Sequence, residues 1–250
     1  RTITCDKDLY THMIQHPEIV VNIWQLMGIT ELAVLRWAHI IAMVYWLGGE
    51  WGVFQTSYNV INRKLSMDER RRHMETAYLI DILPRSAIIL LLPLGLHMGS
   101  IMTYHPLGSS WVIPMWVFVA FWMTITFTSF RHRGTDKGLL YTRIDESFRY
   151  VIIPLLVGFA IYSLITGWPF TASWYAAKVL IYALLLIIGL LLRFIMKEWV
   201  ILFRILDNEG SNKEVENKLS KSLAFGRLLA YFYWIGIASV AWFGVFKPIF

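Results

Sequence analysis

The stretch 32–61 carries five residues suited to chemistry at intervals of three and four positions. They are Arg36, His39, Met43, Trp46 and Glu50. On an α-helix this spacing places all five on one stripe. An imidazole or a thioether can ligate a metal ion or a haem iron, a guanidinium binds acid groups, and a carboxylate binds protons or cations. The stretch therefore predicts one helix with a chemically active face.

The rest of this stretch is apolar and long enough to cross a bilayer, which takes about 20 residues. The whole chain is 57% hydrophobic and 16% charged, with 12 tryptophans among its 250 residues, and its mean hydropathy is +0.53. Soluble domains are about 45–50% apolar and about 25% charged. The composition therefore predicts a membrane protein. A single cysteine, Cys5, excludes an internal disulfide and a site built from several cysteines.

Apolar stretches of this kind recur along the chain and predict an all-α bundle of about six transmembrane helices. The polar segment 131–149 is predicted to be a loop, and the charged segment 204–222 is predicted to be a partly helical loop. Residues 1–31 are predicted to form an outer or interfacial segment, and residues 32–250 the transmembrane domain. The predicted spans are 32–61, 77–104, 111–130, 150–168, 174–196 and 223–246.

Most of the 23 Lys and Arg residues fall in alternate connections, those after the first, third and fifth spans. Basic loops remain on the cytoplasmic side of a membrane. The pattern predicts a multi-pass protein of the bacterial inner (cytoplasmic) membrane with both termini on the outer, periplasmic side. Because these basic residues lie in loops between apolar spans, we expect no nucleic-acid partner.

With this topology, His39, His97 and Lys178 lie at a similar depth, roughly 6–11 Å below the outer interface at about 1.5 Å per residue. Two histidines on different helices at one depth are what a b-type haem needs as axial ligands. Arg36, one turn nearer the outer surface than His39, is suited to bind a haem propionate. The sequence therefore predicts haem b between His39 and His97. Alternatively, both histidines only form hydrogen bonds between helices, and Lys178 extends to the interface.

A second chemistry competes at the same place. Met98, Met102 and His105 follow His97, and Met43 belongs to the first span. Imidazole and thioether groups together suit copper, especially Cu(I). Copper binding or transport is therefore an alternative to haem.

Nearer the inner side, Glu50 and Arg85 are predicted to lie at similar depth, with Asp81 one turn from Arg85. Opposite charges inside a bundle usually form an ion pair. We expect such a pair between Glu50 and Arg85. The alternative is that these residues belong to a proton path or lie close to a quinone.

Two segments resemble a known group of membrane proteins. RWAHIIAMVYWLGG (36–49) resembles the first helix of the HemJ-type protoporphyrinogen oxidases, and also the CopD-type copper-resistance proteins and the membrane domain of PuuD-type urate oxidases. WYAAKVLIYALLLIIGLLLR (174–193) is similar to the HemJ segment in which a lysine follows a tryptophan. The resemblance implies that His39 is a haem-associated histidine and that Lys178 is a functional lysine. The chain has more spans than HemJ proteins, and Glu50 follows the W-x-G element here.

Together these patterns predict a haem-binding membrane protein that transfers electrons, as a membrane subunit of a larger oxidoreductase or as its partner. Its predicted partners are the lipid bilayer, a quinone, and other membrane or periplasmic redox subunits. The alternatives are a HemJ-like porphyrinogen oxidase, a copper-binding or copper-transporting protein, and a structural subunit without a cofactor.

Overall fold

The computed structural model describes residues 29–106, 108–210 and 212–250. They form six long helices and a short 3₁₀ helix, η1, at Ser109–Trp111. All six long helices are long and apolar enough to cross a membrane, which confirms the predicted all-α transmembrane bundle. They are α3 (Glu31–Val60), α4 (Met67–Ile101), α5 (Val112–Arg131), α6 (Asp136–Thr166), α7 (Ser173–Glu209) and α8 (Lys213–Phe246).

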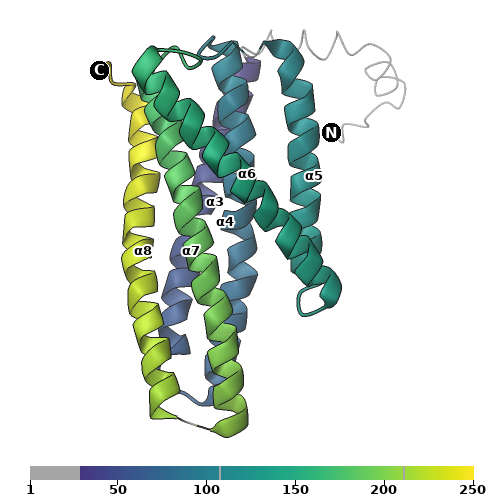
Figure 1. Cartoon of the computed structure of the whole chain (residues 1–250), viewed down its shortest axis with the longest axis vertical. Helices are drawn as coiled ribbons and strands as arrows, with labels where there is room; N and C mark the ends of the chain where they lie inside the picture. The colour runs from purple at the N-terminus through teal and green to yellow at the C-terminus, as the bar shows by residue number, and fades with distance from the viewer. Residues whose placement is uncertain (1–28, 107, 211) are drawn as a thin grey trace, which may run out of the picture.

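The helices pack in sequence order around the bundle, and α8 returns to contact α3. Figure 1 shows α3, α4, α7 and α8 running along the long axis, while α6 crosses that direction at an angle. The start of α3 and the C-terminus lie at one end, which we name the cavity end. The α3–α4 and α7–α8 connections lie at the opposite end, which we name the basic end, and the α5–α6 connection lies on the same side of the bundle but short of that end (Figure 1). The predicted segment 1–31 falls, up to residue 28, outside the described residues.

Polar residues cap the starts of several helices. Ser66 and Glu69 form a capping box, in which the Ser66 hydroxyl accepts a bond from the Glu69 amide and the Glu69 carboxylate accepts one from the Ser66 amide. The Thr135 hydroxyl accepts a bond from the Gly138 amide and begins α6 at Asp136. Such caps provide partners for amides that a helix leaves unpaired at its start.

Charged turns extend α6, α7 and α8 beyond the apolar spans predicted for them. The segment 131–149 is not a loop, since α6 covers 136–166 without a break. Likewise α7 continues to Glu209 and α8 begins at Lys213, so most of 204–222 is helical. Acidic residues of 131–149 pair with basic residues of α7. In 204–222, Leu206, Val215 and Leu219 pack into a buried core.

Buried apolar residues form two cores. The larger core follows the middle of the bundle and includes Trp46, Trp122 and Tyr233. The smaller core lies at the basic end, where Val60 of α3 packs with Trp199 and Phe203 of α7 and with residues of α8. Large apolar side chains such as Ile113 and Ile165 point outward from the bundle and are 72% and 79% exposed. A surface this apolar fits a lipid environment.

Candidate functional site

A cavity of about 510 Å³ lies between α3, α4, α7 and α8. Pockets that hold small molecules and cofactors usually measure about 300–1,000 Å³. We name it the large cavity. Its wall is mostly aliphatic and aromatic, and the polar or sulfur-bearing side chains that line it are Arg36, His39, Met43, Trp46, Met98, Met102, Trp174, Tyr175, Lys178, Tyr182 and Lys247.

Among the described residues that line the large cavity, His39 is the side chain that can bind a metal and also has a buried ring nitrogen without a hydrogen-bond partner. Its Nδ1 is buried and has no hydrogen-bond partner among the described residues. The ring reaches toward α4, where a Cβ placed on Gly95 would lie 3.7 Å from its Cε1. A buried polar atom without a partner costs about 1–3 kcal/mol. His39 is therefore placed to bind a group inside the cavity.

The charges that line the large cavity are all positive. Arg36, Lys178 and Lys247 contribute to its wall, and within the described ranges no Asp or Glu does. Gly244 makes room for the lysine of α7, because a Cβ there would lie 2.9 Å from Lys178 Nζ. The Lys247 ammonium lies 5.6 Å from the centre of the Trp174 ring. An apolar cavity with three cations suits an apolar molecule that carries acid groups.

The structure does not bring His97 into the cavity with His39. Its Nδ1 accepts a bond from Trp116 Nε1 on α5 at 3.3 Å, and its Nε2 lies 3.1 Å from a carboxylate oxygen of Glu31. The reason is the angular position of His97 around the axis of α4. Gly95 lines the cavity, and a residue two positions later is rotated by about 200°. His39 and His97 have the same predicted depth in the membrane, but their side chains point in different directions.

The residues predicted as copper ligands are also divided by the structure. Met98 and Met102 line the large cavity together with Met43. His105 does not; its Nε2 lies 2.8 Å from the Leu96 carbonyl oxygen, and the residue is 6% exposed. In the described part of the chain no three His, Cys, Asp or Glu side chains gather in a group that could hold a metal ion.

Below the large cavity, three aromatic side chains form an aromatic layer, Trp46, Tyr182 and Tyr233. The Trp46 indole donates a hydrogen bond to the Tyr233 hydroxyl at 3.0 Å, and both side chains are 2% exposed. The Trp46 ring meets both tyrosine rings edge to face, with centroids 6.2 Å from Tyr182 and 5.6 Å from Tyr233. Trp46 and Tyr182 also line the large cavity, so this layer is its floor.

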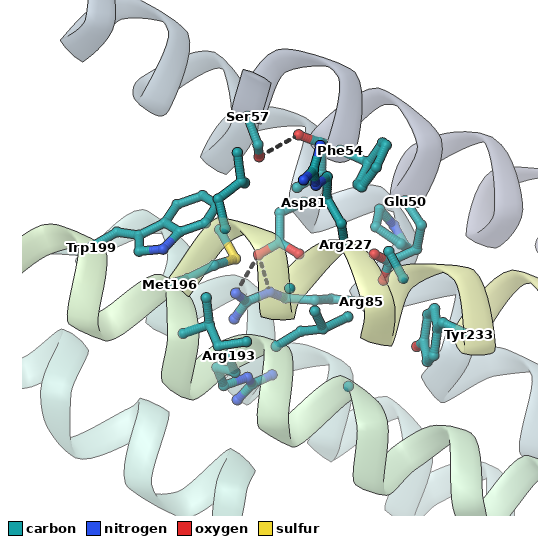
Figure 2. Close-up of a pocket in the computed structure, with 18 of the residues that line it drawn as sticks. Glu50, Phe54, Ser57, Asp81, Arg85, Arg193, Met196, Trp199, Arg227 and Tyr233 are labelled. Atoms are coloured by element: carbon teal, nitrogen blue, oxygen red, sulfur yellow. Dashed lines mark hydrogen bonds and ion pairs between the residues drawn. The ribbon is translucent and has the colours of Figure 1, made fainter. Parts of the chain in front are cut away.

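Beneath this floor lies a second space of about 90 Å³, which we name the small pocket. Both Arg85 Nε and Arg85 Nη2 contact the same carboxylate oxygen of Asp81, one turn earlier on α4. Glu50 lines the pocket as well, but no hydrogen bond or ion pair joins it to Arg85. Figure 2 shows the Asp81–Arg85 pair with Glu50 apart from it. The predicted ion pair of Arg85 therefore forms with Asp81 and not with Glu50.

A cluster of charged residues from α6 and α7 adjoins the small pocket, and sequence reasoning missed it. Asp145 is 2% exposed and accepts bonds from Arg193 Nη1 at 2.6 Å and from Trp122 Nε1 at 2.7 Å. Arg149 Nε lies 3.4 Å from the same carboxylate. Through Asp145, this turn of α6 is linked to Trp122 of α5 and to Arg193 of α7. We name as the charged cluster Asp145, Glu146, Arg149, Arg193 and Lys197, the last of which donates to Glu146 at 2.6 Å.

A signal for this cluster is present in the sequence. Asp145 and Arg149 are four positions apart, the same interval as Asp81 and Arg85, and Arg193 and Lys197 repeat it on α7. Opposite charges at this interval lie on one face of a helix. The signal was overlooked because the low hydropathy of residues 131–149 led to their assignment as a loop.

No protein family model matches the chain, and no curated protein or solved structure is significantly similar to it. The local resemblance of 36–49 and 174–193 to the HemJ group stays a prediction.

Proposed function

We propose that this chain binds haem b in the large cavity and transfers electrons as a multi-pass membrane protein. The observation that carries the proposal is the His39 imidazole, which is unpartnered at Nδ1 in a cavity of cofactor size. Imidazole is the commonest protein ligand of haem iron, and an apolar wall with few polar groups is typical of haem pockets. A bound haem would supply one-electron redox chemistry, and a membrane or periplasmic redox subunit, or a quinone, would be its partner.

The other side chains of the cavity fit the two ends of such a molecule. Arg36, Lys178 and Lys247 are available to bind propionates, since no carboxylate lines the cavity beside them in the described ranges. Met43, Met98 and Met102 offer thioethers, and iron held by histidine and methionine is a known arrangement that raises the reduction potential. We therefore propose that a methionine of the cavity, and not His97, is the second protein ligand.

Haem content of purified variants tests this proposal. His39→Ala should remove the haem, measured from oxidised and reduced absorption spectra together with the haem-to-protein ratio. The matched control is His97→Ala, which removes a histidine at similar depth outside the cavity and should keep the ratio of the parent protein. Haem that survives in His39→Ala but is lost in His97→Ala would contradict the proposal.

Copper is the second candidate, because three thioethers share the large cavity with His39. If the cavity holds Cu(I), the purified protein should contain copper and lack a visible absorption band. Replacing Met43, Met98 and Met102 with leucine should then lower the bound copper, measured by elemental analysis. Stoichiometric haem with no copper in the parent protein would remove this candidate.

We further propose that the basic end faces the cytoplasm of a bacterial cell and that both termini face the periplasm. The support is the positive charge of the connections at that end. In a background with Cys5 replaced by serine, a membrane-impermeant thiol reagent added to sealed cells should label Gly108→Cys. It should not label Asp68→Cys or Asn212→Cys until the cells are opened. Labelling of the cysteine at 212 in sealed cells would reverse the orientation.

A further inference from the structure

The small pocket contains an acid whose chemistry the proposed haem site does not use. Glu50 lies one turn beyond Trp46 on α3 and is only partly exposed. No hydrogen bond or ion pair reaches its carboxyl group from the described residues, although it lines a pocket rich in charged groups. The other acid of the pocket wall, Asp81, is bound by Arg85. Glu50 is thus the acid of this pocket that remains available for proton binding.

The groups that face Glu50 come from every helix that encloses the pocket. Their charges are predominantly positive, and the acids of the adjoining charged cluster are engaged by Arg193 and Lys197. The titratable and charged members of the wall are Asp81 and Arg85 of α4, Arg149 of α6, Arg193 of α7, and Arg227 and Tyr233 of α8.

Two further polar groups at this pocket have hydrogen-bonding capacity that the protein does not fill. Arg149 is 4% exposed, and its Nη2 is buried with no partner among the described residues. The Tyr233 hydroxyl accepts the bond from Trp46, and its own proton has no acceptor within the described part of the chain. A buried water typically makes about three hydrogen bonds to such groups.

The volume of the pocket decides what can complete these bonds. A water molecule needs about 10–15 Å³ of such space, so a pocket of about 90 Å³ has room for several. Four arginines and two acids around that volume supply the polar partners that hold water in place. Because the wall combines water-holding groups with a free carboxyl group, it meets the requirements of a proton-binding site.

We propose that the small pocket holds a water cluster through which Glu50 takes up and releases a proton. The proton moves between water and a carboxylate oxygen of Glu50, and the carboxyl group alternates between neutral and charged forms. The site lies directly under the aromatic layer, since Tyr233 lines the small pocket while its bonding partner Trp46 lines the large cavity. Charge on a ligand of the large cavity and the proton on Glu50 are therefore separated by one layer of side chains.

Infrared difference spectroscopy of the purified full-length protein in lipid nanodiscs tests this directly. Between about pH 4 and pH 10, the parent protein should show a carboxylic acid band that disappears as the carboxylate band grows, and that shifts in heavy water. Glu50→Gln should lose this band. Glu75→Gln, which removes an exposed acid of α4, should keep it.

A second variant tests the water without touching the acid. Gly226 lines the pocket, and a Cβ there would lie 3.8 Å from Ile195, an ordinary contact. Gly226→Ala should therefore fold, reduce the space, and slow the hydrogen–deuterium exchange of the Glu50 band severalfold. The proposal is overturned if the parent protein lacks the band at every pH, if Glu50→Gln retains it, or if the band neither titrates nor exchanges. An exchange rate that Gly226→Ala leaves unchanged would overturn the water cluster.

Discussion

Replacing Asp145 with alanine should destabilise the bundle by about 3–5 kcal/mol, the cost of removing one partner of a buried ion pair. The carboxylate serves two arginines at once, Arg149 and Arg193, which are 4% and 8% exposed. Without it both guanidinium groups keep their charge away from water, and the Trp122 indole loses its acceptor. Thermal unfolding in detergent, followed by circular dichroism, measures the loss.

The matched control is Glu146→Ala, one position along the same helix. Its main partner, Lys197, has a side chain that is 49% exposed, so water can replace the lost carboxylate. Glu146 is itself 8% exposed and also lies 3.8 Å from Arg193, so we expect the control to destabilise the bundle, but by less than Asp145→Ala because Lys197 remains hydrated. Equal losses for the two variants would contradict the role given to Asp145.

A second large effect is expected at the basic end, where Arg70 and Glu216 form a buried, two-pronged ion pair. The two N–O distances are 2.7 Å and 3.0 Å, and Arg70 Nε also donates to the Val60 carbonyl. Both side chains are less than 5% exposed, at 3% and 4%. Arg70→Met leaves the Glu216 carboxylate buried with only Arg63 nearby, at 3.8 Å, and should cost about 3–5 kcal/mol.

The double variant Arg70→Met with Glu216→Leu distinguishes the cost of leaving one charge unpaired from other effects of replacing Arg70. Because it removes both charges, it should recover most of the stability that Arg70→Met loses. Glu214→Ala serves as a control on the same helix, since its pair with Lys218 is exposed and should contribute less than about 1 kcal/mol. A double variant as unstable as Arg70→Met alone would show that the pair does not account for the loss.

Hydropathy was sufficient to predict the number of helices and the helix that carries His39. It located the apolar part of each span, since a run of about 20 apolar residues is typical of a transmembrane helix. It failed at 131–149 and understated the helical content of 204–222, because the helices continue through charged turns. Pairing between distant segments, such as Arg193 with Asp145, stabilises those turns, and hydropathy along one segment contains no information about a partner on another.

The sequence predicted how far along their helices the site residues lie, but not the direction in which each side chain points. Lys178 and His39 both line the large cavity, as their matched depth suggested. His97 has the same depth but faces Trp116 and Glu31. Which way a residue points depends on how each helix is rotated against its neighbours. The part of α4 that precedes His97, residues 87–96, is apolar on every face, so the sequence leaves that rotation undetermined.

We expect the charged cluster to limit how deeply this protein sits in a bilayer. From Ser173 to Arg193, α7 rises roughly 30 Å at about 1.5 Å per residue, which equals the thickness of a typical hydrocarbon layer. Moving the bundle toward the cavity end would draw Arg193, Asp145 and Arg149 into hydrocarbon, whereas moving it toward the basic end would immerse the large cavity more deeply. We therefore expect the cluster to oppose movement toward the cavity end and so to hold His39 within the half of the membrane farthest from the basic end.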